Sequence, residues 1–520
     1  MDTSALAIKG LANIDYAIII FYMIGVFVIG TYYGKYVKNA GDLFLAGKSL
    51  PFWAIGMSIV VSDIGATDFI FVGGAAYTYG IAVANFDWMG SMPAMVIAAF
   101  LFIPYFWRSG VYTIPEFLGK RYNAGVQMIH ALLWGIFLFV MLGVMLGTTA
   151  KLLNTVLGWN FQFSLWLMVF IVGIYTYSGG LAAVVMTDVI QMIVMFVGGL
   201  AMALLCIWEA GGWSGMKAKI LAMDGHADHF TILLPNSTTT PYPWTGIVLG
   251  LGLVMATAYM SGNQAVVQRC FGARSEWDAK GGMLFGGFLK AFIPLMVALP
   301  GLAAVVLIPG LERGDDAIPR VIHDILPPGL TGLMFSALFA ALMSSVDSSL
   351  NSATTIWTTD IYGRVLQLST GKYPTEKHAL TVGRFFTVVF IVGAALIAPW
   401  IIKHESMYSF IQTALSMFQG PVFAILLLGI MWKRATQWGG LAGMVLGVCF
   451  TTILSNTKGL FPYEDPFLFV AWWSFVFSAA VTIVVSLLTK PDPDEKLHGL
   501  IFGQVMKDGN VQRVLLDRVS

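Results

Sequence analysis

The chain has 520 residues, of which 58% are hydrophobic and only 11% are charged, and its mean hydropathy is +0.78. A soluble domain carries about 25% charged residues, so this composition indicates a polytopic membrane protein. The net charge of +1 gives no reason to expect a nucleic acid partner, and three widely spaced cysteines argue against a disulfide framework.

Apolar stretches of about 20 residues, long enough to cross a bilayer, recur along the whole chain. In chain order they cover residues 15–35, 50–78, 82–106, 124–152, 161–179, 181–209, 243–267, 281–309, 329–360, 380–402, 406–432, 438–456 and 467–489. We therefore predict an all-α fold with about thirteen transmembrane helices.

The loops between these stretches are short, so residues 1–489 are predicted to form a single transmembrane domain. Residues 15–35 would be an extra N-terminal helix, and residues 438–489 would be two peripheral helices. The polar tail at residues 490–520 is expected to lie at the cytoplasmic surface.

Basic residues of the loops fall mainly on one side of the predicted membrane, and they include Arg121 and Arg269. The positive-inside rule then places the N-terminus outside and the C-terminus in the cytoplasm, which requires an odd number of spans. Short loops favour a plasma membrane location, and specifically a bacterial inner membrane. No obligate protein partner is evident beyond the lipid bilayer.

The second apolar stretch contains two aspartates, at residues 58–74 (SIVVSDIGATDFIFVGG). A carboxylate in hydrocarbon costs at least about 2.5 kcal/mol, so an aspartate there indicates function. On a continuous helix Asp63 and Asp68 would point about 140° apart. A break around Gly65 would let both side chains line a cavity, as in transporters with interrupted helices.

The ninth stretch carries a stripe of small and hydroxyl side chains. Ser344, Ser348 and Ser352 recur at i, i+4 and i+8, and Ala341 and Ser345 form the adjacent stripe. Such a stripe often means close helix packing. Because hydroxyls and carbonyls also suit alkali cations, a cation site is the alternative interpretation.

Other charged residues inside spans are Asp87, Asp188, Asp347 and Lys290. Asp188 shares a helix face with Gln191, and it is either a functional group or a helix-terminal carboxylate at the interface. A second interruption, glycine-rich and then polar, covers residues 250–264. A pair of interrupted segments suggests two inverted repeats, at residues 50–209 and 243–432.

Several motifs together resemble one family. They are YTIPEF (112–117), KRYN (120–123), GGL (179–181), TD (187–188), NQ (263–264), VQR (267–269), GFLK (287–290), LPG (299–301), ALMSS (341–345), LNS (350–352) and DIY (360–362). The chain resembles the sodium/solute symporter family, in its sodium/glucose cotransporter-like branch, over about residues 15–435. The resemblance implies a LeuT-like core of five plus five helices and alternating access.

The resemblance also implies a sodium site between the broken helix and the serine stripe. Its ligands would be the carbonyls of Val61, Ile64 and Ala341 with the hydroxyls of Ser344 and Ser345. Some members have a second sodium site, which would use Asp188 together with Ser345. Asp63 and Gly65 would form the helix break and gate.

The same resemblance implies a solute site, which matches the sugar-binding members in part. Its residues would be Thr67, Asp68, Asp87, Asn263, Lys290 and Gln412. Asp68 could accept from hydroxyls, attract a cation, or pair with Lys290, and the last option ranks first because it satisfies two buried charges. The stacking aromatic of these members is replaced by Ala265, and a binding serine by Gly90.

These features predict a sodium-coupled symporter that imports a small polar solute, with a sugar or polyol as the first choice and Na⁺ as the coupling ion. One alternative is a sodium symporter for a charged or zwitterionic metabolite (an organic cation, a carboxylate or an amino acid), and another is an ion channel. No HExxH motif or paired-carboxylate active site lies within the spans, so an enzyme is not expected.

Overall fold

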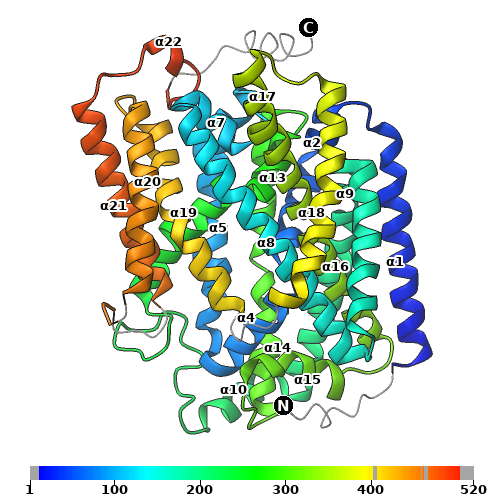
Figure 1. Cartoon of the computed structure of the whole chain (residues 1–520). Helices are drawn as coiled ribbons and strands as arrows, with labels where there is room; N and C mark the ends of the chain where they lie inside the picture. The colour runs from blue at the N-terminus through cyan, green and yellow to red at the C-terminus, as the bar shows by residue number, and fades with distance from the viewer. Residues whose placement is uncertain (1–10, 402–406, 458, 462–465, 504–520) are drawn as a thin grey trace.

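The computed structural model describes residues 11–401, 407–457, 459–461 and 466–503. In these residues every regular element is a helix, and the long helices pack side by side in one bundle (Figure 1). The first half contains α1 (Asn13–Tyr33), α2 (Ala40–Leu45), α3 (Phe52–Asp63), α4 (Ala66–Tyr79), α5 (Met92–Ile97), α6 (Ile103–Arg108), α7 (Ile114–Arg121), α8 (Ala124–Leu157), α9 (Phe161–Glu209) and α10 (Gly212–Leu221).

The second half contains α11 (Thr257–Gly262), α12 (Gln264–Phe271), α13 (Glu276–Lys290), α14 (Ile293–Leu307), α15 (Ala317–Asp324), α16 (Leu330–Ile356), α17 (Gly363–Thr370), α18 (Glu376–Ile401), α19 (Met407–Met431), α20 (Gln437–Asn456), α21 (Phe467–Leu488) and α22 (Asp494–Leu497). Two π-helical segments matter for the site, η5 (Phe86–Ser91) and η7 (Gly246–Ala256).

Among the described residues, ten helices are long and apolar enough to cross a membrane, or up to eleven when a bent pair is counted as one span. Two of these segments, Asp68–Arg108 and Phe161–Glu209, have 41 and 49 residues. At 1.5 Å per residue, each is longer than a single crossing needs. The all-helical membrane fold is thus confirmed, whereas the count of thirteen spans stays a prediction.

Both predicted interruptions are present. α3 ends at Asp63, Ile64 and Gly65 have extended backbones (ψ 97° and 169°), and α4 begins at once. In the second half, Asn263 is extended (ψ 118°) between α11 and α12, and the chain bends there by 50°. The two breaks free backbone groups inside the bundle, where they can line a site.

α16 is the most buried long helix of the bundle, and Figure 1 shows it among α1, α9 and α18. α1 anchors its first turn, because the Asp15 carboxylate accepts hydrogen bonds from the backbone N–H groups of Gly329 and Gly332, each at 2.7 Å. α9 packs along α16 and bends at Gly180 (φ 52°). The serine stripe of α16 therefore faces protein rather than lipid.

The described part of the tail folds back on the bundle at the end where α7 and α17 lie (Figure 1). Asp492 lies 3.7 Å from the buried Arg121, and Lys496 Nζ donates to the carbonyl of Tyr122 at 2.5 Å. The tail thus closes one end of the bundle. Its cytoplasmic location and the boundaries of the two repeats remain predictions.

Candidate functional site

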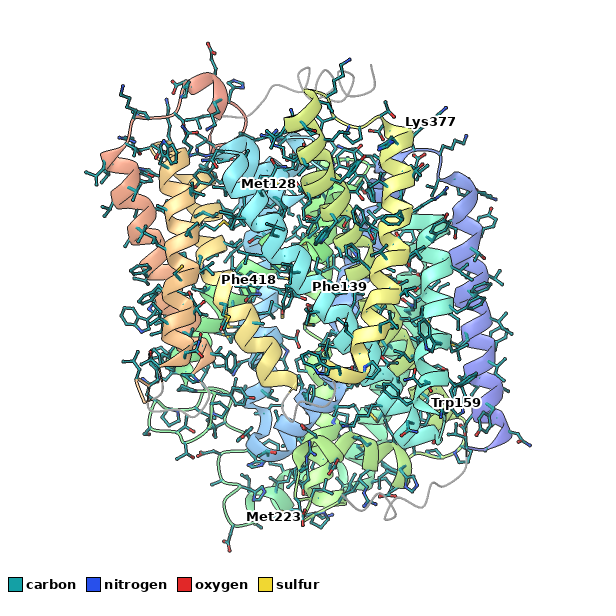
Figure 2. All side chains as sticks on the ribbon, viewed as in Figure 1. Met128, Phe139, Trp159, Met223, Lys377 and Phe418 are labelled. Atoms are coloured by element: carbon teal, nitrogen blue, oxygen red, sulfur yellow. The ribbon has the colours of Figure 1, made fainter. Side chains whose placement is uncertain are left out.

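Side chains fill most of the space between the helices, as around Phe139 of α8 and Phe418 of α19 in Figure 2. A cavity of about 240 Å³ lies next to the first helix break. Its polar lining is Ser62, Asp63, Gly65, Asp68, Asp87, Ser91, Tyr259, Lys290, Ser345 and Gln419. Its apolar lining includes Phe71, Phe86, Met145, Leu251 and Met255. The cavity is large enough for a small polar solute and offers both donors and acceptors.

A buried ion-pair cluster lies on one side of this cavity. The side chain of Lys290, at the end of α13, is 4% exposed and contacts two carboxylates. Its Nζ pairs with Asp63 at the end of α3 and lies 3.0 Å from Asp87 on η5. The indole of Trp88 donates to the carbonyl of Ala291 at 3.0 Å and holds η5 against α13. Two acceptors therefore compensate the burial of one ammonium group.

Asp68 does not form the predicted pair with Lys290. Its carboxylate accepts a hydrogen bond from the backbone N–H of Gly65 at 2.7 Å, which closes the N-terminus of α4. A carboxylate at this position is stabilised by the free N–H groups of the first turn. The pairing prediction was wrong because Asp63, on the other side of the break, is the carboxylate that contacts Lys290.

Three of the predicted sodium ligands, Ala341, Ser344 and Ser345 of α16, lie together beside Ser62 at the same break. The hydroxyl of Ser345 donates to the carbonyls of Ser62 (3.1 Å) and Ala341 (2.9 Å). The hydroxyls of Ser62 and Ser344 are 2.8 Å apart. Val61 and Ile64 flank Ser62 on the last turn of α3 and in the break. This oxygen-rich arrangement has the donor chemistry that Na⁺ requires.

Asp188 of α9 is fully buried, so the interpretation as an interfacial carboxylate was wrong. It accepts from Ser58 and, at 2.5 Å, from the hydroxyl of Ser344. It therefore joins α9 to both α3 and α16. Nearby on α16, Asp347 is also buried and accepts from Tyr175 Oη at 2.5 Å.

The sequence interpretation missed the buried position of Arg269. It lies in the last turn of α12, its side chain is 1% exposed, and it pairs with Asp188 at 3.2 Å. Its guanidinium also donates to Ser62 Oγ at 2.5 Å and to Ser348. The sequence interpretation counted it as a loop base, although the short helix that follows the predicted interruption was an available signal.

Other predicted solute residues are placed differently. Asn263 lies outside the cavity lining, and its side chain accepts from the N–H of Ala265 at the start of α12. The side chains of Thr67 and Gln412 lie outside the described residues. Tyr259, which sequence reasoning overlooked, is an aromatic residue of the cavity lining, whereas Ala265 is not part of the lining.

The interrupted helices and the buried polar cavity beside an oxygen cluster define a multi-pass membrane protein of the secondary-transporter class. Comparison with known proteins specifies the family. Residues 43–447 match the sequence model of the Sodium:solute symporter family. The chain belongs to this family, so the resemblance seen in its motifs is confirmed, and Na⁺ is its coupling ion.

Two curated relatives and one solved structure illustrate the similarity. The sodium/glucose cotransporter of Vibrio parahaemolyticus is 33% identical over 511 residues, covering 94% of this chain and 92% of the relative. The human sodium/myo-inositol cotransporter is 30% identical over 547 residues, covering 94% and 75%. The structure of a Na⁺-coupled sialic acid symporter superimposes with a TM-score of 0.82 at 23% identity, covering 92% of this chain and 99% of that one. This likeness supports the LeuT-like fold.

Proposed function

We propose that the protein imports a small sugar or polyol together with Na⁺ by alternating access. The observation that carries this proposal is the direct contact between two sites. Ser62 and Ser345 belong both to the lining of the cavity and to the oxygen cluster around the helix break. Binding of Na⁺ would therefore shape one wall of the solute cavity.

The polar groups of the cavity suit hydroxyl-rich solutes. Asp87 and Lys290 provide acceptors and a donor, Gln419 provides both, and Tyr259 provides an aromatic face. Relatives named for glucose and myo-inositol support the same solute class. The roles predicted for Thr67, Asn263 and Gln412 remain part of this proposal only as predictions.

Coupling follows from the position of the proposed sodium ligands on two helices. An ion held by the carbonyls of Val61, Ile64 and Ala341 and by the hydroxyls of Ser344 and Ser345 would fix the broken helix against α16. Sodium then tightens solute binding, and solute tightens sodium binding by the same factor. One charge crossing about 100 mV supplies about 2.3 kcal/mol, and a tenfold gradient adds about 1.4 kcal/mol. Together they sustain about several hundredfold accumulation.

A second ion would use Asp188 and Ser345, and it is the less supported part of the proposal because Arg269 already pairs with Asp188. We further propose that the N-terminus faces outward and the C-terminus the cytoplasm, in a bacterial inner membrane. The proposed partners are the solute, Na⁺ and the bilayer. The family is one of transporters, and we propose no catalytic activity.

The test is uptake into proteoliposomes under an inward sodium gradient, with potassium as the replacement. Ser345→Ala should raise the sodium concentration for half-maximal uptake about tenfold or more, because a buried ligand to a charged ion is lost. Ser336→Ala is the matched control, since this serine of α16 bonds only to the carbonyl of Gly332 at 2.9 Å. The proposal would be refuted if the wild-type protein took up neutral sugars equally well with the sodium gradient and with potassium in its place.

A further inference from the structure

The cavity lining contains more acidic than basic side chains. Asp63, Asp68 and Asp87 line it, and Lys290 is its one basic lining residue among those that the structure describes. Ionised carboxylates in a site screened from water need compensating cations. One ammonium group leaves two negative charges, and a sodium ion beside Ser62 and Ser345 would leave one.

Lys290 has little capacity left for an anionic solute. Its Nζ is an ion-pair partner of both Asp63 and Asp87, and all three side chains are less than 15% exposed. Two of the three N–H donors of this ammonium group serve the aspartates, so a solute carboxylate could use only the third and would add a further negative charge beside two buried carboxylates, which is unfavourable. The cluster therefore selects against sugar acids.

Asp68 is the carboxylate that no basic side chain neutralises in the described structure. Within the described part of the chain, its carboxylate accepts a hydrogen bond from the backbone N–H of Gly65 through Oδ2. Asp68 and Tyr259 both line the cavity. A cavity that contains a carboxylate and an aromatic side chain is a favourable environment for an ammonium group.

On the basis of the proposed function, we propose that the preferred solute is a polyol or sugar that carries a positively charged amine, with the amine directed to Asp68. The hydroxyl groups would bind Asp87, Lys290 and Gln419. With sodium bound, the single positive charge of such a solute brings the site to neutrality. This conclusion concerns the solute class and leaves the sodium site unchanged.

The experiment compares four related sugars that differ in charge. They are neutral glucose, cationic glucosamine, neutral N-acetylglucosamine and anionic glucuronate. Each competes for sodium-driven uptake of labelled glucose by the full-length protein in proteoliposomes at about pH 7, where most of the amine is still protonated. Glucosamine should compete about tenfold or more better than glucose and N-acetylglucosamine, as expected for one charge-assisted hydrogen bond. Glucuronate should compete least.

Asp68→Asn tests the assignment of the amine. An asparagine oxygen can still accept from the N–H of Gly65, so the start of α4 is retained. In this variant glucosamine should lose its advantage over N-acetylglucosamine. If the variant does not fold, the wild-type ranking alone decides.

Each outcome is informative. Sodium-driven uptake of glucose with no preference for glucosamine, or with glucuronate as the best competitor, would overturn the inference and leave the proposed function standing. If labelled glucose and labelled glucosamine both fail to enter in a sodium-dependent manner, the proposed function itself fails.

Discussion

The Arg269–Asp188 pair offers a strong test of how the core is held together. The two side chains are 1% and 0% exposed, and they link α12 to α9. Replacement of Arg269 by Met removes the cation and leaves the Asp188 carboxylate buried without its partner. Loss of one member of a buried pair costs about 3–5 kcal/mol. Arg269→Met should therefore be strongly destabilised.

The double variant Arg269→Met/Asp188→Asn separates the pair from simple loss of packing. With both charges removed, no carboxylate remains uncompensated, so most of the lost stability should return. The assay is thermal unfolding of the purified proteins in one detergent at one protein concentration. The expected order is wild type, then the double variant, then Arg269→Met. A double variant as unstable as the single variant would refute the view that the uncompensated charge dominates.

Three further predictions address single residues. Lys290→Met should abolish sodium-driven uptake and also lower stability by about 3 kcal/mol or more, because two buried carboxylates lose their cation; uptake and thermal unfolding are measured on the same preparation, and wild-type stability would contradict this. Gly180→Ala should cost at least about 2 kcal/mol, because φ is 52° and a Cβ would lie 2.3 Å from the carbonyl oxygen of Leu43; Gly25→Ala, where nothing lies within 4 Å, is the control. Asp15→Ala should cost about 1–2 kcal/mol in the same unfolding assay, and Asp15→Asn less, because the asparagine oxygen can still accept from the N–H of Gly332.

The sequence was sufficient for features that depend on local cost. Asp63 and Asp68 in one apolar stretch, with Gly65 between them, predicted the break, because a continuous helix would have exposed one of the two aspartates to lipid. The break is present between Asp63 and α4. The serine stripe of α16 was likewise located from its spacing. Spacing alone could not choose between close helix packing and a cation site.

Pairings between distant residues could not be predicted in the same way. The sequence analysis paired Lys290 with Asp68, but the actual partner depends on how the break turns the chain. Asp68 follows the break and binds the N-terminus of its own helix, whereas Asp63 precedes it and reaches Lys290. Asp68, the partner that charge alone favoured for Lys290, instead forms a local capping bond at the start of α4.

The two arginines counted as loop charges show a related limit of sequence reasoning. The positive-inside rule counts basic residues near span ends as if each were at the membrane surface. Arg121 is fully buried, and its guanidinium donates to the carbonyls of Gly429 (2.6 Å) and Ala435 (2.9 Å). Arg269 is buried beside Asp188. Both arginines bind groups inside the protein. The predicted membrane orientation therefore rests on the basic residues that remain at the surface. The positive-inside rule can be applied reliably only when the burial of each basic residue is known.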